Sequence, residues 1–169
     1  MQRVVILGCG GSGKSTLARR LGARTGLPVV HLDRCFWKPG WVPTPEDEWR
    51  AVQTELVAAD RWIIDGNYSL TLDVRLPRAD TVIFFDFATW RTVSRVLWRT
   101  TRDLGKETQA DGCPEKFEWS FIKWVATYRG RSLPRTIAAI TKDAAHAHLH
   151  VLRRPRDVER FLSQFTDAL

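Results

Sequence analysis

Gly8-Cys9-Gly10-Gly11-Ser12-Gly13-Lys14-Ser15-Thr16 decides the fold of this chain. The stretch matches the pattern Gly-x-x-x-x-Gly-Lys-[Ser/Thr], in which glycines let the backbone curl until several N–H groups face one polyphosphate. Lys14 places a positive charge near the β- and γ-phosphates, Ser15 offers a hydroxyl to Mg²⁺, and the following helix adds its N-terminal dipole. We therefore predict ATP and Mg²⁺ as cofactors and Lys14 as a catalytic residue. The loop residues predicted to bind the nucleotide are Gly8, Gly10, Gly11, Ser12, Gly13, Lys14, Ser15 and Thr16.

The same glycines also match Gly-x-Gly-x-x-Gly, the dinucleotide-binding pattern, and Asp33 follows at the distance expected of a ribose-binding acid. A lysine directly after the third glycine has no role with a pyrophosphate in that fold. Gly13-Lys14-Ser15 instead meets each demand of a triphosphate loop, which favours the triphosphate interpretation.

Apolar runs alternate with segments of helical spacing along the chain, which is typical of an α/β fold with a parallel sheet. A chain of 169 residues with 44% hydrophobic residues is expected to form a single domain, 1–169. Thr44 as N-cap and Pro45 at the first helical position predict the start of a second helix. The long stretch between the fourth and fifth strands has room for a mobile lid at about 100–135. The predicted strands are 4–7, 29–33, 62–65, 81–87 and 149–152.

Composition narrows the setting of the protein. No apolar run reaches the length of a membrane helix and no signal segment precedes the glycine loop, so we expect a cytoplasmic protein without a membrane partner. The three cysteines are widely spaced, which indicates reduced thiols. The net charge of +7 is concentrated between residues 88 and 135, where a phosphorylated ligand or DNA could bind. We favour a monomer.

Three acids end predicted strands at the edge where ligands collect in parallel sheets. Asp65 precedes Gly66 and is the first candidate to hold Mg²⁺ together with Ser15, and Asp86 is the alternative. Asp33 could deprotonate or orient an acceptor hydroxyl, or it could be an ordinary turn acid.

Four arginines follow one side of a predicted helix: Arg91, Arg95, Arg99 and Arg102. A solvated face is the simple interpretation, but such faces usually mix charges of both signs, and this one has no acid before Asp103. Arginines that close over a γ-phosphate neutralise its developing charge, so we predict Arg95 and Arg99 as catalytic residues. Trp37 and Trp41 lie in a proline-glycine loop after Asp33, where they could stack on an acceptor or cover the sheet edge.

Several short motifs occur in a fixed order: the glycine loop, His31-Leu32-Asp33, Trp37-x-Pro39-Gly40-Trp41, Trp62-Ile63-Ile64-Asp65-Gly66-Asn67-Tyr68, Arg95-Val96-Leu97-Trp98-Arg99 and Gly112-Cys113-Pro114-Glu115-Lys116. In this combination the chain resembles the FlaR-type topology modulation proteins, which are adenylate-kinase-like P-loop kinases. The resemblance runs as far as residues 152–158.

The resemblance implies a three-layer P-loop NTPase fold, a parallel sheet of order 2-3-1-4-5 and a helical lid. It also implies that Asp65 is the acid of an Asp-Gly pair, that Arg95 and Arg99 belong to the lid, and that Arg153 and Pro155 bind the nucleotide near its adenine. The residues after Gly66 depart from adenylate kinases, which leaves the phosphate acceptor open. A hydroxyl acceptor would use Asp33 as its base, and a nucleoside monophosphate could bind Arg75.

We therefore expect a kinase that transfers the γ-phosphoryl group of Mg-ATP to a nucleotide or small-molecule acceptor. The alternative is an ATP-binding regulatory protein that affects DNA topology through its basic segment, without robust turnover. No DNA-reading motif is found in the sequence.

Overall fold

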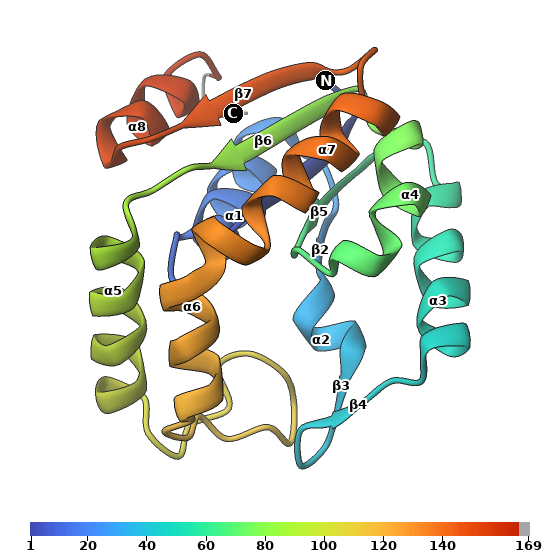
Figure 1. Ribbon diagram of the computed structural model, residues 1–169. Coiled ribbons are helices and arrows are strands. Elements are labelled where there is room, and N and C mark those ends of the chain that lie inside the picture. The colour runs from blue at the N-terminus through green and yellow to red at the C-terminus, as the bar shows by residue number, and fades with distance from the viewer. Residues whose placement is uncertain (166–169) are drawn as a thin grey trace.

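The computed structural model describes residues 1–165, and its centre is a parallel sheet of five strands. The strands are β1 (Arg3–Gly8), β2 (Val29–His31), β5 (Trp62–Asp65), β6 (Thr81–Phe85) and β7 (His148–Leu152). They stand in the order β2-β5-β1-β6-β7 (Figure 1). Counted in chain order within this sheet, the arrangement is 2-3-1-4-5. The predicted fold class is confirmed.

Helices precede and follow these strands in alternation. They are α1 (Lys14–Thr25), α2 (Leu32–Phe36), α3 (Glu46–Ala58), α4 (Leu72–Arg75), α5 (Thr89–Arg102), α6 (Trp119–Arg131), α7 (Leu133–Asp143) and α8 (Pro155–Leu162). Two short 3₁₀ turns, Ser69–Thr71 and Leu76–Arg78, flank α4.

The layers follow from the alternation of side chains along each strand. In β1, Val5 and Leu7 pack with residues of α3, α4 and α7 on one face of the sheet. Val4 and Ile6 point the other way and pack with α1 and α8. All four side chains are completely buried, as expected for a parallel sheet covered by helices on both sides.

Three predicted boundaries were wrong by a few residues. The second strand ends at His31, and Asp33 lies in the first turn of α2 instead of at a strand end. The fourth strand ends at Phe85, two residues early. Pro45, not Thr44, is the N-cap of α3, and the Thr44 hydroxyl donates to the carbonyl of Phe36 instead of capping the helix.

A small antiparallel hairpin, β3 (Trp37–Lys38) and β4 (Val42–Pro43), was not predicted. Its turn uses Gly40 and Trp41, both with positive φ. The hairpin lies beside the connection between α5 and α6 (Figure 1), since the Gly40 N–H donates to the Gly112 carbonyl at 2.8 Å. The indole N–H of Trp41 donates to the Pro114 carbonyl at 2.9 Å.

The helices α5, α6 and α7 are inserted between β6 and β7, where the lid was expected. No helix within residues 1–165 is long and apolar enough to span a membrane.

Candidate active site

The glycine loop joins β1 to α1 at the carboxyl edge of the sheet. Gly8, Gly11 and Gly13 have φ values of 145°, 74° and 97°, which residues other than glycine rarely adopt. A Cβ atom at Gly11 would lie 2.6 Å from the carbonyl oxygen of Thr92 in α5. The loop therefore depends on glycine both for its turn and for its close contact with α5.

Lys14 and Ser15 begin α1 and line the main cavity of the protein. The Lys14 ammonium donates to the carbonyl of Cys9 at 3.0 Å. Burial lowers the pKa of Lys14, and the nearby charges of Asp65 and Asp33 partly oppose that shift. The half-buried cation thus lies within the field of two carboxylates at the glycine-loop end of the cavity.

Asp65 ends β5 and joins the loop to β2. Its Oδ2 accepts a hydrogen bond from the Ser15 hydroxyl at 2.6 Å, and its Oδ1 lies 2.5 Å from Nδ1 of His31. Asp65 is only 3% exposed. Hydroxyl and carboxylate oxygens are the ligand type that Mg²⁺ prefers, and phosphates usually complete its coordination. Ser15 and Asp65 therefore fit a magnesium ion bound next to a triphosphate.

Asp86, the alternative magnesium ligand, lies in different surroundings. Its carboxylate pairs with Arg129 at 3.0 Å and with Arg153 at 3.7 Å.

Pro155 lines the main cavity, whereas the side chain of Arg153 is 69% exposed and is not part of the lining. The proposed contact of these two residues with adenine stays a prediction.

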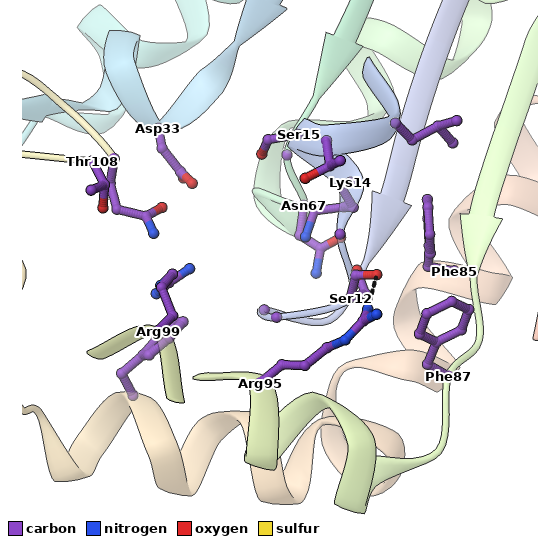
Figure 2. Close-up of a pocket in the computed structure, with 18 of the residues that line it drawn as sticks. Ser12, Lys14, Ser15, Asp33, Asn67, Phe85, Phe87, Arg95, Arg99 and Thr108 are labelled. Carbon is purple, nitrogen blue, oxygen red and sulfur yellow. Dashed lines mark hydrogen bonds between the residues drawn. The ribbon is translucent and has the colours of Figure 1, made fainter. Parts of the chain in front are cut away.

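Asp33 also lines the main cavity. One of its oxygens accepts a hydrogen bond from the Tyr68 hydroxyl at 2.5 Å. Burial and the negative charge of Asp33 strongly raise the pKa of Tyr68, so the phenol keeps its proton and remains a donor. In Figure 2 the Asp33 side chain faces the cavity from the side opposite Arg99.

The turn after β5 supports both Asp33 and the glycine loop. Tyr68 has a left-handed φ of 36°, which is uncommon for a residue with a side chain. The Asn67 amide oxygen accepts the Gly8 N–H at 2.9 Å. The fully buried Arg75 donates to the carbonyls of Gly66 and Asn67 at 2.8 and 2.6 Å. The idea that Arg75 binds an acceptor phosphate is therefore wrong, because its guanidinium is enclosed by the backbone of this turn.

The two arginines predicted to be catalytic enter the same cavity from α5. Arg95 donates to the carbonyl of Ser12 in the glycine loop at 3.3 Å (Figure 2). Arg99 is held by the buried carboxylate of Glu115 at 3.1 Å. The outer members of the stripe differ, since Arg102 pairs with Asp103 and Arg91 lies over the ring of Trp90.

The main cavity has a volume of about 930 Å³ and contains the glycine loop, Asp33 and both inner arginines. Its lining includes six cations against three carboxylates. The cations are Lys14, Arg19, Arg20, Arg95, Arg99 and Arg102, and the carboxylates are Asp33, Asp103 and Glu159. This excess of positive charge suits a polyphosphate ligand.

Several residues of the site were not singled out from the sequence for these roles. His31 stands beside Asp65 in the register of β2 and β5, and Asn67, Tyr68, Gln109 and Glu115 hold other groups of the cavity in place. A usable signal was present for the first three, because polar residues at or directly after parallel strands gather at one edge of the sheet.

The sheet order and the glycine loop between β1 and α1 define an α/β fold of the P-loop kinase type. Shikimate kinase from Acinetobacter baumannii, in complex with shikimate, is similar with a TM-score of 0.60 and 14% identity, over 97% of this chain and 90% of that one. A gluconokinase from Sinorhizobium meliloti 1021 is similar with a TM-score of 0.56 and 14% identity, over 96% and 92% of the chains. A sugar kinase from Janibacter sp. HTCC2649 has a TM-score of 0.52 and 21% identity, over 96% and 93%.

At these identities the likeness establishes the fold. No protein-family model and no curated protein sequence matches the chain, so the resemblance to the FlaR-type proteins has no support from these comparisons.

Proposed function

We propose that this protein is a P-loop kinase that transfers the γ-phosphoryl group of Mg-ATP to a hydroxyl group of a small molecule. One observation carries the proposal: the carboxylate of Asp33 and the phosphate loop with Lys14 open into the same cavity. The kinase structures of the same fold are consistent with it. The adenylate-kinase-like subtype remains a resemblance of the sequence.

In this proposal the loop amides and Lys14 hold the triphosphate, while Ser15 and Asp65 hold Mg²⁺, which would neutralise phosphate charge. Asp33 accepts the proton of the acceptor hydroxyl as its oxygen forms a bond to the γ-phosphorus. The bond from that phosphorus to the β,γ-bridging oxygen breaks, and ADP leaves with the electron pair.

The arginines of α5 stabilise the charge that is transferred. Arg95 contacts the glycine loop and Arg99 faces Asp33 across the cavity (Figure 2), so the two would lie on either side of the γ-phosphoryl group. The segment 100–135 acts as the lid that excludes water during transfer.

A hydroxyl acceptor fits better than a nucleoside monophosphate. Adenylate-kinase-like enzymes need a cation that grips the acceptor phosphate, and the candidate, Arg75, is completely buried and bound to backbone carbonyls. The negative charge of Asp33 would also repel the phosphate of such an acceptor. A hydroxyl, in contrast, can donate its proton to Asp33.

The test is ADP release from Mg-ATP, coupled to NADH oxidation, against a panel of hydroxyl compounds and nucleoside monophosphates, with Lys14→Ala as the blank. Asp33→Asn is expected to lower kcat by about 10²-fold or more because the general base is lost, with little change in the KM for ATP. Asp73→Asn is the matched control, since Asp73 is exposed and pairs with Arg50 on the surface. The proposal would be refuted if nucleoside monophosphates were the only acceptors that support turnover, or if Asp33→Asn kept its activity.

A further inference from the structure

A second cavity of about 380 Å³ adjoins the main one. The second cavity opens on the side of the proposed base, because the two linings share six residues: Asp33, Trp37, Arg99, Gln109, Phe121 and Trp124. Its volume lies near the lower end of the roughly 300–1,000 Å³ that ligand pockets occupy, which suits a small molecule. On the proposed function, this is where the acceptor would be placed.

Aromatic rings form two walls of this acceptor cavity. Trp37 and Trp41 come from the hairpin, and Phe121 and Trp124 come from α6. Each pair is in ring contact, at 5.5 Å between the two tryptophans and 5.7 Å between Phe121 and Trp124. All four rings are half-buried, so part of their apolar surface remains for a ligand. Such walls favour a ligand with a flat face that can lie against aromatic rings.

The hairpin wall is held by contacts within the protein. Trp41 donates its indole N–H to the Pro114 carbonyl at 2.9 Å, and its ring lies 5.9 Å from the ammonium of Lys116. Trp37 packs edge-on against Phe36 at 4.8 Å. A preformed wall loses little conformational entropy when a ligand is bound.

The charges of the acceptor cavity differ from those of the main cavity. Its lining has three carboxylates, from Asp33, Glu115 and Glu118, against two cations, from Arg99 and Lys116. The charge of Arg99 is balanced by that of Glu115, which accepts from its Nη2 at 3.1 Å and from its Nε at 3.3 Å. The cavity therefore has no excess positive charge with which to hold an anionic group.

The amide of Gln109 completes this arrangement. With its side-chain oxygen turned toward Arg99, that oxygen accepts from Nη1 at 2.6 Å. Gln109 and Asp33 both line the cavity, where the NH₂ group of the amide is a donor and the carboxylate is an acceptor. The polar groups at this end of the cavity thus suit a hydroxyl-bearing ring.

From the aromatic walls and this balance of charge, we infer that the acceptor is a ring compound with a flat face and at least one hydroxyl group, and without an anionic group. The inference deepens the proposed function and rests on it. It also distinguishes this site from one that selects a carboxylate- or phosphate-bearing acceptor.

The experiment compares matched pairs of probes by calorimetry, with the protein saturated by Mg²⁺ and a non-hydrolysable ATP analogue. Glucose is paired with glucuronate, and adenosine with adenosine monophosphate, so that each pair keeps the ring and adds one anionic group. The first pair tests a saturated ring and the second an aromatic base. The same probes are then tested for turnover with ATP.

At least one neutral probe is expected to bind 10-fold or more tightly than its anionic partner. Trp37→Leu should weaken that binding at least 10-fold, whereas Trp37→Phe, which keeps a ring and guards against a folding defect, should stay within about 3-fold. Trp90→Leu is the control, because Trp90 is 67% exposed and lies outside both linings.

Each outcome decides one of the two proposals. Tighter binding of the anionic members, equal effects of Trp37→Leu and Trp90→Leu, or binding of no neutral probe would overturn the inference. Turnover with an anionic acceptor alone would overturn it while leaving kinase activity intact. Trp37-dependent binding of a neutral ring without turnover of any probe would confirm that the cavity prefers a neutral ring, but it would refute the proposed function and, with it, the assignment of that ring as the phosphate acceptor.

Discussion

Replacing Arg75 by methionine tests how the turn after β5 is held. Arg75 is 0% exposed, and its guanidinium donates to the carbonyls of Gly66 at 2.8 Å, Asn67 at 2.6 Å and Tyr68 at 3.4 Å. Methionine keeps most of the apolar stem but donates no hydrogen bond. The carbonyls that face the guanidinium would lose their partner in the interior of the protein.

The magnitude follows from two opposing terms. Each of the two short bonds from a charged donor is worth about 1.5–3 kcal/mol, and unpaired buried carbonyls add to the cost. Against this, methionine removes a buried cation whose desolvation is costly, and the same burial lowers the pKa of Arg75 to about 9. We expect Arg75→Met to lower the free energy of unfolding by about 3 kcal/mol, a large part of the roughly 5–15 kcal/mol of a typical domain.

Urea unfolding followed by tryptophan fluorescence measures this change. With a slope of about 2 kcal/mol per molar urea, the midpoint should fall by about 1.5 M. The urea midpoint of Arg75→Lys should lie between those of the wild type and Arg75→Met, since an ammonium can reach fewer carbonyls than the planar guanidinium. Arg78→Met is the matched control, because Arg78 is exposed and makes one contact of 3.5 Å, to the Ala58 carbonyl. A loss below about 1 kcal/mol for Arg75→Met, or equal losses for Arg75→Met and Arg78→Met, would refute the structural role of Arg75.

Two further substitutions test the phosphate loop and the start of β1. Gly11→Ala would place a Cβ at a left-handed φ of 74° and only 2.6 Å from the Thr92 carbonyl, so calorimetry should find ATP bound at least about 10-fold more weakly. Gly26→Ala is the control, because Gly26 has a similar φ of 66° but open space around it, and this variant should leave the affinity for ATP unchanged. Burial raises the pKa of Asp80, but hydrogen bonds from the Thr81 hydroxyl and from two backbone amides outweigh this effect, so the pKa in the folded protein is lowered. The resulting stabilisation is present above about pH 4 and is lost as the pH falls through the pKa of the folded protein. Asp80→Asn should therefore lower the free energy of unfolding by about 1–2 kcal/mol at pH 7 and by much less at pH 3; equal losses at both pH values would contradict this account.

The sheet and the phosphate loop could be predicted because their signals are local. A buried parallel strand is a short apolar run, and the loop is specified by glycine spacing followed by Lys14 and Ser15. The hairpin had no such signal, since its strands have two residues each and depend on contacts with residues 112 and 114. Asp33 was placed at a strand end because the sequence gives no sign that α2 begins at Leu32.

The structural difference between the arginines of α5 could not be read from their spacing. Arg99 and Arg102 both form ion pairs, with Glu115 and Asp103, but Arg99 is 26% exposed and Arg102 is 53% exposed. The decisive partner of Arg99 lies 16 residues further along the chain, in a connection without regular structure. Only the folded connection brings Glu115 to the cavity and so distinguishes one arginine from another.

The three turns that follow β1, β2 and β5 are joined by hydrogen bonds into one support for the site. Asn67 accepts from the phosphate loop at Gly8, Tyr68 donates to Asp33 after β2, and Asp65 accepts from Ser15 at the start of α1. The glycine-loop side and the Asp33 side of the cavity, proposed to bind nucleotide and acceptor, therefore share a single backbone segment, residues 65–68. Because a misplacement of about 1 Å between reacting groups can cost about 10²-fold in rate, this cross-linking would let one buried turn set the distance between nucleotide and acceptor. On this reasoning, defects in the turn should impair nucleotide and acceptor binding together, whereas defects in the aromatic walls should impair acceptor binding alone.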